Sequence, residues 1–398
     1  MLILRKSVIF IMLFWCTPTR VFQEFLYPVG IVQHEENQKI CILYQKNSHL
    51  ELWFWDPESL EAVKGLLSSF TPAGVSVLPH QQSFSFIDND RIRIKDLAKR
   101  SHRTLDLPYG PYDLTTLEWI NNQSFYFCAR EREHLNLFHA TTEGELFHLT
   151  RSTTNDYSYP QKIEDHLFYI VKNDEGEITL EHADYPIKQF PQHSWNEENQ
   201  DFKEKLRIIF EEENNTFTKT YLDSTTKKTL YTWKDQDKEL AFLFMKNISK
   251  GYFLTHPATI NINDDYMTFE CYTLICQTEV TIKKLFSFDI PLHLLMPQHN
   301  QPERLYESML PLLPLYNEDA IYYSHDSGEG LCIYKYDEAT DKKEELTQAN
   351  NGHNFAPICY DNKMYYGGTV SHSDGLPHTS PEMWINENGN QKFDFPIL

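Results

Sequence analysis

Three histidines, His134, His139 and His148, stand close together in the chain and are the clearest candidates for metal binding or proton transfer. Metal ligands must converge on one point. These histidines lie on the two predicted strands of one hairpin, where successive side chains point to opposite faces. We therefore expect them to be exposed or packed in the core, and the sequence predicts no metal site.

Nucleophilic catalysis is not indicated either. The sequence contains no G-x-S-x-G motif, which would place a serine on a strained turn, and no phosphate-binding loop or dinucleotide fingerprint. Residues 324–328 (SHDSG) resemble the start of the Asp-box turn of sialidases, but the Thr-Trp that completes that turn is missing. Because Asp, Ser and Gly are ordinary turn residues, we predict no catalytic residue and no cofactor.

Acidic residues give the chain a net charge of −21, which disfavours nucleic-acid binding because the phosphate backbone would be repelled. Clusters at 88–90, 211–213 and 264–265 offer oxygen ligands for calcium, but none has the spacing of a known calcium loop. We expect them to be turn residues and solvated charge. The charge favours solubility and is compatible with a basic partner.

Four residues are predicted to contact a partner: Trp195, His293, Gln298 and His299. Trp195 stands in a polar loop, where an exposed aromatic side chain is a plausible contact residue. The other three belong to a long segment, 291–303, with three prolines and no clear strand. Insertions in loops cost little stability and often add function. Divergence of one repeat is the simpler explanation of this segment.

The N-terminus has the pattern of a secretory signal peptide. Arg5 and Lys6 precede the apolar run VIFIMLFW, and small or polar residues follow it. The run is short for a membrane span. We predict a signal peptide over residues 1–20, with an uncleaved anchor or a buried strand as alternatives. The protein is then exported to the periplasm, the cell envelope or the medium, and its N-terminus could attach it to a membrane surface.

Six cysteines follow the predicted signal. An exported setting permits disulfides, but spacing alone does not define a pairing. Cys41, Cys128 and Cys332 lie inside apolar runs, where a thiol usually behaves as a small buried hydrophobic group.

Most of the chain repeats one strand pattern. Eight apolar strands open the units, with the sequences ICILY, SFSFI, SFYFC, HLFYIV, LRIIF, MTFECY, AIYYS and KMYYGG, starting at residues 40, 83, 124, 166, 206, 267, 320 and 363. Where it is regular, the period is about 40–45 residues, as for four-stranded propeller blades. In most units a polar turn rich in Asp, Asn, Gly, Ser or Thr joins the next two strands, which is a hairpin signal.

The sequence therefore predicts an all-β fold, a β-propeller of four-stranded blades over residues 25–398. Eight blades are expected, with seven as the alternative. Irregular insertions are expected near 238–262, as an added hairpin, and near 291–303. The last unit has three strands of its own, so the N-terminal strand FLYPVGIVQ is expected to pair with them and close the ring.

Two units show a more specific pattern. One reads SFYFCARER, HLNLFHATTEGE and LFHLTRSTTNDYSYP, and the other reads AIYYSHDSGEG, LCIYKYDEATDKKE and ELTQANNGHNFAP. Both place Leu-Thr after the third strand and a proline further on. These units resemble the WD-repeat-like propeller repeats of the TolB type. That resemblance implies a β-propeller and, by analogy, a periplasmic protein that interacts with other proteins.

We therefore expect an exported, non-enzymatic propeller that engages a protein or peptide through one face or through the central funnel. The alternative is a propeller-based hydrolase acting on glycans with paired carboxylates at the funnel mouth. A third possibility is an architectural domain of a cell-envelope complex. An enzyme should gather acids, or histidine with acids, whose pKa values are perturbed.

Overall fold

The computed structural model describes most residues between Glu24 and Phe393. Residues 1–23, 185–227, 258–264, 296–311 and several short loops lie outside the described set. The predicted signal peptide over 1–20 is therefore outside the described residues. No helix among the described residues is long and apolar enough to cross a membrane.

The described strands form seven sheets of four strands each, and consecutive strands are neighbours within every sheet. We number these sheets as blades 1 to 7. Blades 1 to 4 consist of β1 (Glu24–His34), β2 (Asn37–Lys46), β3 (His49–Trp55), β4 (Ala62–Ser68); β5 (Ala73–Val77), β6 (Ser83–Asp88), β7 (Arg91–Asp96), β8 (Ser101–Asp106); β9 (Leu114–Asn121), β10 (Ser124–Glu131), β11 (His134–Thr141), β12 (Leu146–His148); and β13 (Asn155–Ile163), β14 (His166–Asn173), β15 (Ile178–Asp184), β16 (Lys228–Trp233). Blades 5 to 7 consist of β17 (Lys238–Asn247), β18 (Lys250–Pro257), β19 (Tyr266–Cys276), β20 (Val280–Pro291); β21 (Leu315–Asn317), β22 (Ala320–Asp326), β23 (Leu331–Asp337), β24 (Lys342–Glu345); and β25 (Gly352–Tyr360), β26 (Lys363–Ser371), β27 (Thr379–Asn386), β28 (Asn390–Phe393).

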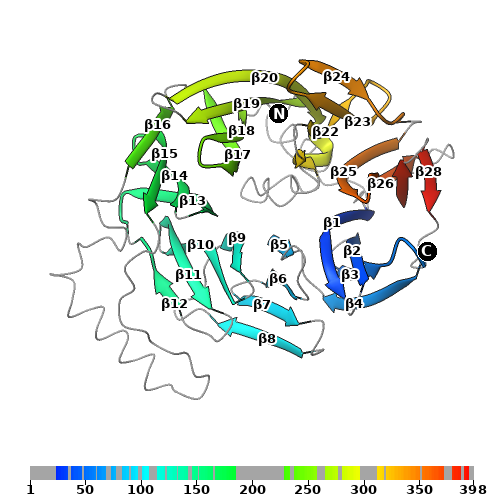
Figure 1. Cartoon of the computed structure of the whole chain (residues 1–398), viewed down its shortest axis with the longest axis horizontal. Coiled ribbons are helices and arrows are strands. Elements are labelled where there is room, and N and C mark those ends of the chain that lie inside the picture. Colours follow the sequence, from blue (N-terminus) through cyan, green and yellow to red (C-terminus); the bar gives the residue numbers. More distant parts are fainter. Residues whose placement is uncertain are drawn as a thin grey trace, which may run out of the picture.

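The blades stand side by side around a ring, with the first strand of each on the inner side and the fourth on the outer rim (Figure 1). The all-β propeller is confirmed, but the expectation of eight blades is wrong. Six of the eight predicted opening strands are second strands of blades, whereas MTFECY is the third strand, β19, of blade 5. LRIIF, from residue 206, lies outside the described residues.

Two further expectations are corrected in the same region. The segment 238–262 was expected to be an added hairpin, but β17 and β18 are the first two strands of a regular blade. The local hairpin expected in most units is absent from the described part of blade 4, because β15 pairs with β16, which begins at Lys228. The repeat pattern is lost here because residues 185–227 separate two strands of one sheet.

Ring closure also differs from the prediction. β1 pairs with β2 in blade 1, and β25 supplies the first strand of blade 7, so no strand is exchanged. The two blades meet through side chains: Trp55 lies edge-on to Tyr365 with 5.4 Å between ring centroids, and Tyr27 to Phe355 with 6.1 Å. At Gly367 a Cβ atom would overlap the carbonyl oxygen of Leu26, so the contact depends on glycine.

Apolar residues run continuously through the second strands because both faces of a blade are covered. In β10, Phe125 and Phe127 pack toward blade 2, while Tyr126 and Cys128 pack toward blade 4, and all four are 0% exposed. The predicted burial of Cys41, Cys128 and Cys332 is confirmed, since each is at most 1% exposed. All six cysteines from Cys41 to Cys359 are free thiols.

The Leu-Thr pairs have the same role in blades 3 and 6. Leu149 N–H donates to Leu137 O at 2.9 Å, and Thr150 Oγ1 accepts from Leu137 N–H at 2.9 Å. In blade 6, Leu346 N–H donates to Ile333 O at 2.8 Å, and Thr347 Oγ1 accepts from Ile333 N–H at 2.9 Å. The dipeptide thus satisfies both backbone groups of one buried strand residue.

The prolines that follow each Leu-Thr pair lie in bulges of the inner strands. The register shifts between Ser158 and Gln161 in β13 and between Phe355 and Ile358 in β25. The residue before each proline has a positive φ, 52° at Tyr159 and 51° at Ala356. The extra residue of such a bulge bends the strand and redirects its side chains.

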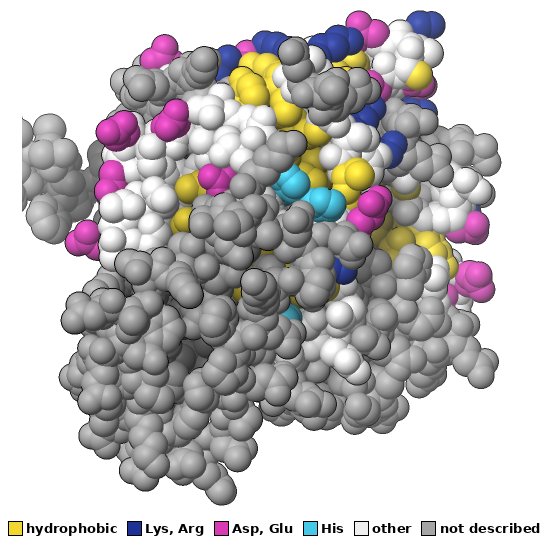
Figure 2. All heavy atoms as spheres, turned by 60° about the vertical axis from the view of Figure 1, so that its left-hand side comes forward, with side chains coloured by type: hydrophobic (Ala, Val, Ile, Leu, Met, Phe, Trp, Pro, Cys, Tyr) yellow, Lys and Arg dark blue, Asp and Glu magenta, His cyan; other side chains and the backbone are white. Residues whose placement is uncertain are grey.

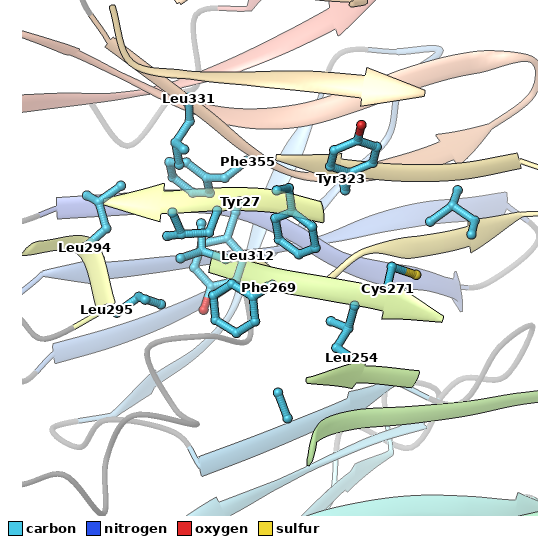
Figure 3. Packing of buried hydrophobic residues seen from close by; sticks show 14 of the residues in the cluster. Tyr27, Leu254, Phe269, Cys271, Leu294, Leu295, Leu312, Tyr323, Leu331 and Phe355 are labelled. Carbon is cyan, nitrogen blue, oxygen red and sulfur yellow. The ribbon is translucent and has the colours of Figure 1, made fainter. Parts of the chain in front are cut away.

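The described part of the predicted long loop at 291–303 is a short helix, α3 (Leu292–Leu295), on the inner side of the ring (Figure 1). Leu292, Leu294 and Leu295 are at most 8% exposed. They belong to a large apolar cluster with Leu312 and with residues of blades 1, 5, 6 and 7 (Figure 3). This part of the segment therefore packs as core.

Candidate functional site

An apolar crevice separates blades 4 and 5. It is lined by Ile170, Ile178, Leu180 and Tyr231 of blade 4 and by Leu240, Leu243, Phe253 and Leu274 of blade 5. Its cavity volume is about 20 Å³, room for about one water molecule, because most of the lining side chains are buried. We name it the blade 4–5 crevice. Its lining is aliphatic and aromatic, so apolar groups that cover its mouth would be removed from water there.

The inner strands fix the narrow side of this crevice. The side chain of Gln161 in β13 forms two hydrogen bonds with the backbone of β17. Its Nε2 donates to Leu243 O at 2.5 Å, and its Oε1 accepts from Met245 N–H at 2.7 Å. The Tyr159 hydroxyl donates to Ala241 O at 2.6 Å. Among the described strands, β13 and β17 are the pair in close contact across this boundary. Beyond them, buried apolar side chains of the two blades pack together in one cluster.

The mouth of the crevice lies between two outer strands. Tyr231 comes from β16, and Val280 and Ile282 of β20 pack at the edge of the same apolar cluster. Tyr231, Val280 and Ile282 are all partly exposed. Figure 2 turns this side of the ring forward and shows a strip of hydrophobic side chains with lysines along its upper end. The crevice therefore opens on the circumference of the ring.

An ionic cluster lies on the same face of blade 5. The Glu270 carboxylate accepts hydrogen bonds from Lys238, from Lys284 at 2.5 Å and from Tyr272 at 2.5 Å. Burial opposes ionisation of Glu270, but these three donors outweigh it and lower its pKa to about 2. Two lysines on one carboxylate leave positive charge beside the apolar walls. Nearby, Lys172 pairs with Glu239 at 3.2 Å.

A second polar group lies between blades 3 and 4. Glu118, Tyr126 and His139 stand opposite one another on β9, β10 and β11, and Tyr126 lies 5.5 Å from His139 between ring centroids. Tyr169 of blade 4 packs in the same cluster as Tyr126, and its burial together with the nearby Glu181 carboxylate raises its pKa.

The pKa values of this group are perturbed mainly by desolvation. Glu118 keeps accessible surface but is enclosed by protein, which raises its pKa to about 7. Burial lowers the pKa of His139 to about 4, so its imidazole is neutral at pH 7. An acid with a pKa near 7 could serve in proton transfer.

The predicted partner-contact residues are largely untested. Trp195, Gln298 and His299 lie outside the described residues, and His293 belongs to α3 but its side chain is not described. They remain predictions.

The other candidate motifs have structural surroundings. His134 Nδ1 lies 3.4 Å from Asp156 Oδ1. The His139 side chain is 9% exposed and packs in the core, which is one of the two environments expected for these histidines. Residues 324–328 lead into the turn between β22 and β23, where Gly328 N–H donates to Asp326 Oδ1 at 2.9 Å. In the part of the chain that the structure describes, no group of three or more His, Cys, Asp or Glu side chains could bind a metal ion.

The crevice residues escaped prediction because they have no chemical signature. Ile170, Leu180 and Leu274 look like ordinary strand residues, and they meet only when two blades are placed side by side. One usable signal was the irregular stretch between residues 184 and 238, since both walls of the crevice flank it. Irregular places in a repeat often carry function.

Comparisons with known proteins support the fold. No protein-family model and no curated protein matches the chain. The structure is similar to TolB from Acinetobacter baumannii, with 9% identity over 81% of this chain and 63% of TolB at a TM-score of 0.46. The β-propeller that the predicted resemblance implies is confirmed by the seven four-stranded sheets.

Two other solved structures are similar at a higher TM-score. A puromycin hydrolase variant matches with a TM-score of 0.56 and 8% identity over 92% of this chain and 53% of that chain. An oligogalacturonate lyase in complex with manganese matches with a TM-score of 0.50 and 10% identity over 87% and 85%. The chain thus spans about half of the puromycin hydrolase. At these identities the likeness concerns the fold alone.

Proposed function

We propose that this protein is an exported, non-enzymatic binding protein that engages a protein or peptide partner in the blade 4–5 crevice. The observation that carries the proposal is the crevice itself, with apolar walls from two blades and an open mouth beside Tyr231. Apolar side chains of a partner that cover this mouth would contribute about 25 cal/mol for each Å² of apolar surface removed from water.

The chemistry around the crevice supports binding more than catalysis. One acid of blade 5, Glu270, already accepts three hydrogen bonds and has a pKa of about 2, so it is a poor proton carrier at neutral pH. The lining side chains are aliphatic or aromatic. Such surfaces recognise apolar groups and use nearby charges to orient them.

The proposed location differs from the central funnel or propeller face expected from the sequence. Leu292, Leu294 and Leu295 of α3 pack on the inner side of the ring, which argues against that side as the main docking surface. Tyr231 and Ile282, at the mouth of the crevice, instead belong to β16 and β20, which are outer strands of the ring (Figure 1).

Export is part of the proposal and depends on Arg5, Lys6 and the apolar run after them. Expression of the full chain with a C-terminal tag, followed by fractionation and N-terminal sequencing, tests it. A mature chain that begins close to residue 20 in the exported fraction is expected. A cytosolic chain that keeps Met1 would contradict export and leave the crevice proposal standing.

The binding proposal is tested at Tyr231. The tagged wild type and Tyr231→Glu serve as baits in the exported fraction, with Tyr266→Glu as the control because Tyr266 is 47% exposed and lies outside the crevice. We expect a partner to be retained by wild type and Tyr266→Glu and lost with Tyr231→Glu. Equal retention by all three proteins would refute the crevice as the binding site.

A glycan-active hydrolase is the second candidate, because Glu118 has a pKa of about 7 and a raised carboxyl pKa suits a general acid. A panel of glycan substrates with wild type and Glu118→Gln distinguishes the two. The binding proposal expects turnover by neither protein. Turnover by wild type that falls at least a hundredfold in Glu118→Gln would establish the hydrolase instead.

A further inference from the structure

We infer that the partner is an extended acidic peptide segment that joins blade 5 as a fifth strand, along the outer edge of β20. This inference rests on the proposed function, since it specifies the partner of the blade 4–5 crevice and how it is bound. The juxtaposition that supports it is a long outer strand, an apolar crevice beside one of its faces, and lysines on both of its faces.

The strand itself is suited to strand addition. β20 has 12 residues. One of its two edges is paired with β19, where every residue from Tyr266 to Cys276 has a partner. It is the last strand of its sheet, and no described strand pairs with its other edge. A long sheet edge of this kind offers a row of backbone donors and acceptors to an extended peptide.

The direction of the backbone groups follows from the ladder. Cys276 N–H donates to Ser249 O at 2.7 Å, so Cys276 and Leu274 face β18, and Ile275 and Thr273 face β20. Thr281 and Lys283 are the partners of Ile275 and Thr273 and therefore face inward to β19. The N–H and C=O groups of the alternating residues point outward, namely those of Val280, Ile282 and Lys284.

The side chains of an added strand would continue the two faces of the sheet. Val280 and Ile282 pack against the apolar cluster that lines the crevice. Because side chains of neighbouring strands stand on the same face in register, every second residue of the peptide would face the crevice mouth and Tyr231. Aliphatic residues suit those positions.

Charge selects the remaining positions of the peptide. Lys283 is exposed on the opposite face of β20, and on that face Lys343 of β24 lies 5.7 Å from the centre of the Phe286 ring. On the crevice face, Lys284 shares Glu270 with Lys238. The alternate peptide positions lie on the face opposite the crevice, beside Lys283 and Lys343. Carboxylates at those positions would be attracted to these two lysines.

The same charges argue against a second copy of this chain as the occupant. Two β20 edges brought together would place Lys283 and Lys284 near their equivalents, and like charges on paired strands are destabilising. Edge lysines commonly prevent such self-association. An acidic strand converts that repulsion into attraction.

The probe is a fluorescein-labelled peptide of seven residues that alternates valine and glutamate, and binding to the full-length chain is measured by fluorescence anisotropy. A peptide with lysine in place of glutamate tests the charge. A peptide with N-methyl groups on alternate residues keeps the side chains but removes backbone donors. We expect at least tenfold weaker binding for each of these two control peptides.

Protein variants give a matched pair at Ile282. Ile282→Pro removes the outward N–H and the side chain, whereas Ile282→Ala removes only the side chain. We expect Ile282→Pro to bind the valine–glutamate peptide at least tenfold more weakly than Ile282→Ala. Lys283→Glu is expected to weaken binding at least fivefold. Circular dichroism and the melting temperature establish that each variant is folded, and the N-methyl peptide needs no variant.

The outcomes separate the two proposals. If Tyr231→Glu weakens binding but neither Ile282→Pro nor N-methylation does, the peptide enters the crevice without joining the sheet, and strand addition is overturned while the proposed function stands. If the backbone changes weaken binding and Tyr231→Glu has no effect, the crevice proposal fails and strand addition stands. A concentration-dependent dimer that Ile282→Pro abolishes, or no binding of the peptide, would overturn the inference.

Discussion

Replacement of Thr347 by valine tests how the repeat is stabilised. The two side chains have nearly the same shape, but valine lacks the hydroxyl that accepts from Ile333 N–H at 2.9 Å and from Asn354 Nδ2 at 3.2 Å. Thr347 is 2% exposed and Ile333 is 0% exposed, so water cannot replace the lost acceptor. A buried unsatisfied N–H costs about 1–3 kcal/mol.

Asn354 loses less, because its Nδ2 also donates to Gln348 O at 3.0 Å. We therefore expect Thr347→Val to lower the free energy of unfolding by about 2 kcal/mol, mainly through the buried N–H. Thr347→Ser is the matched control, because it keeps the hydroxyl and loses only a methyl group, which costs about 1 kcal/mol or less. Urea unfolding followed by tryptophan fluorescence measures both.

The equivalent change in blade 3 provides a second measurement. Thr150→Val removes the acceptor of Leu137 N–H and the donor to Asn136 Oδ1, at 2.9 and 3.2 Å. If the Leu-Thr pair has one role in both blades, the two valine variants should lose similar stability, within about 1 kcal/mol. A loss below about 0.5 kcal/mol in either valine variant, or a serine variant as unstable as its valine counterpart, would refute the reasoning.

Three other changes are expected to have measurable effects. Gly367→Ala should lower the free energy of unfolding by about 1–3 kcal/mol, because the new Cβ overlaps Leu26 O at the ring closure; an unchanged urea midpoint would contradict this. His139 has a pKa of about 4 in the folded state, so below pH 6.5 the unfolded state binds a proton there that the folded state does not. The free energy of unfolding of the wild type should therefore fall by up to about 3 kcal/mol between pH 6.5 and 4. Urea unfolding of His139→Phe over the same range should show a smaller fall. Glu118 has a raised pKa of about 7, so its contribution to stability is lost as pH rises through 7; Glu118→Gln should therefore be stabilised relative to wild type at pH 8 and not at pH 5, by thermal melts.

The repeat pattern identified the strands well and their grouping poorly. Apolar runs such as SFYFC predict buried strands because both faces of a blade need apolar side chains, as Phe125 and Tyr126 illustrate on opposite faces. The sequence does not say whether the strand before each run belongs to the same sheet or to the previous one. That choice determines how the ring closes, and here β1 pairs with β2 of its own blade.

The candidate site was less predictable than the fold. Catalytic and metal motifs can be searched for by residue type and spacing, but the blade 4–5 crevice consists of residues such as Leu180, Tyr231 and Leu274, which are common in strands. Their meeting depends on the path of the chain between β15 and β16, which no local pattern encodes. The ionic group around Glu270 likewise joins three strands, β17, β19 and β20.

Closure by side chains alone has a consequence for synthesis on the ribosome. Each blade takes its four strands from consecutive parts of the chain, so blade 1 can complete its hydrogen bonds while blade 7 is still untranslated. A propeller that exchanges a strand must instead leave an open sheet until its last residues emerge. In the part of the chain that the structure describes, the last blade contributes packing surfaces such as Phe355 and Tyr365 to Tyr27 and Trp55, and no strand. In blade 4, by contrast, β15 must wait for β16 before its second edge is paired.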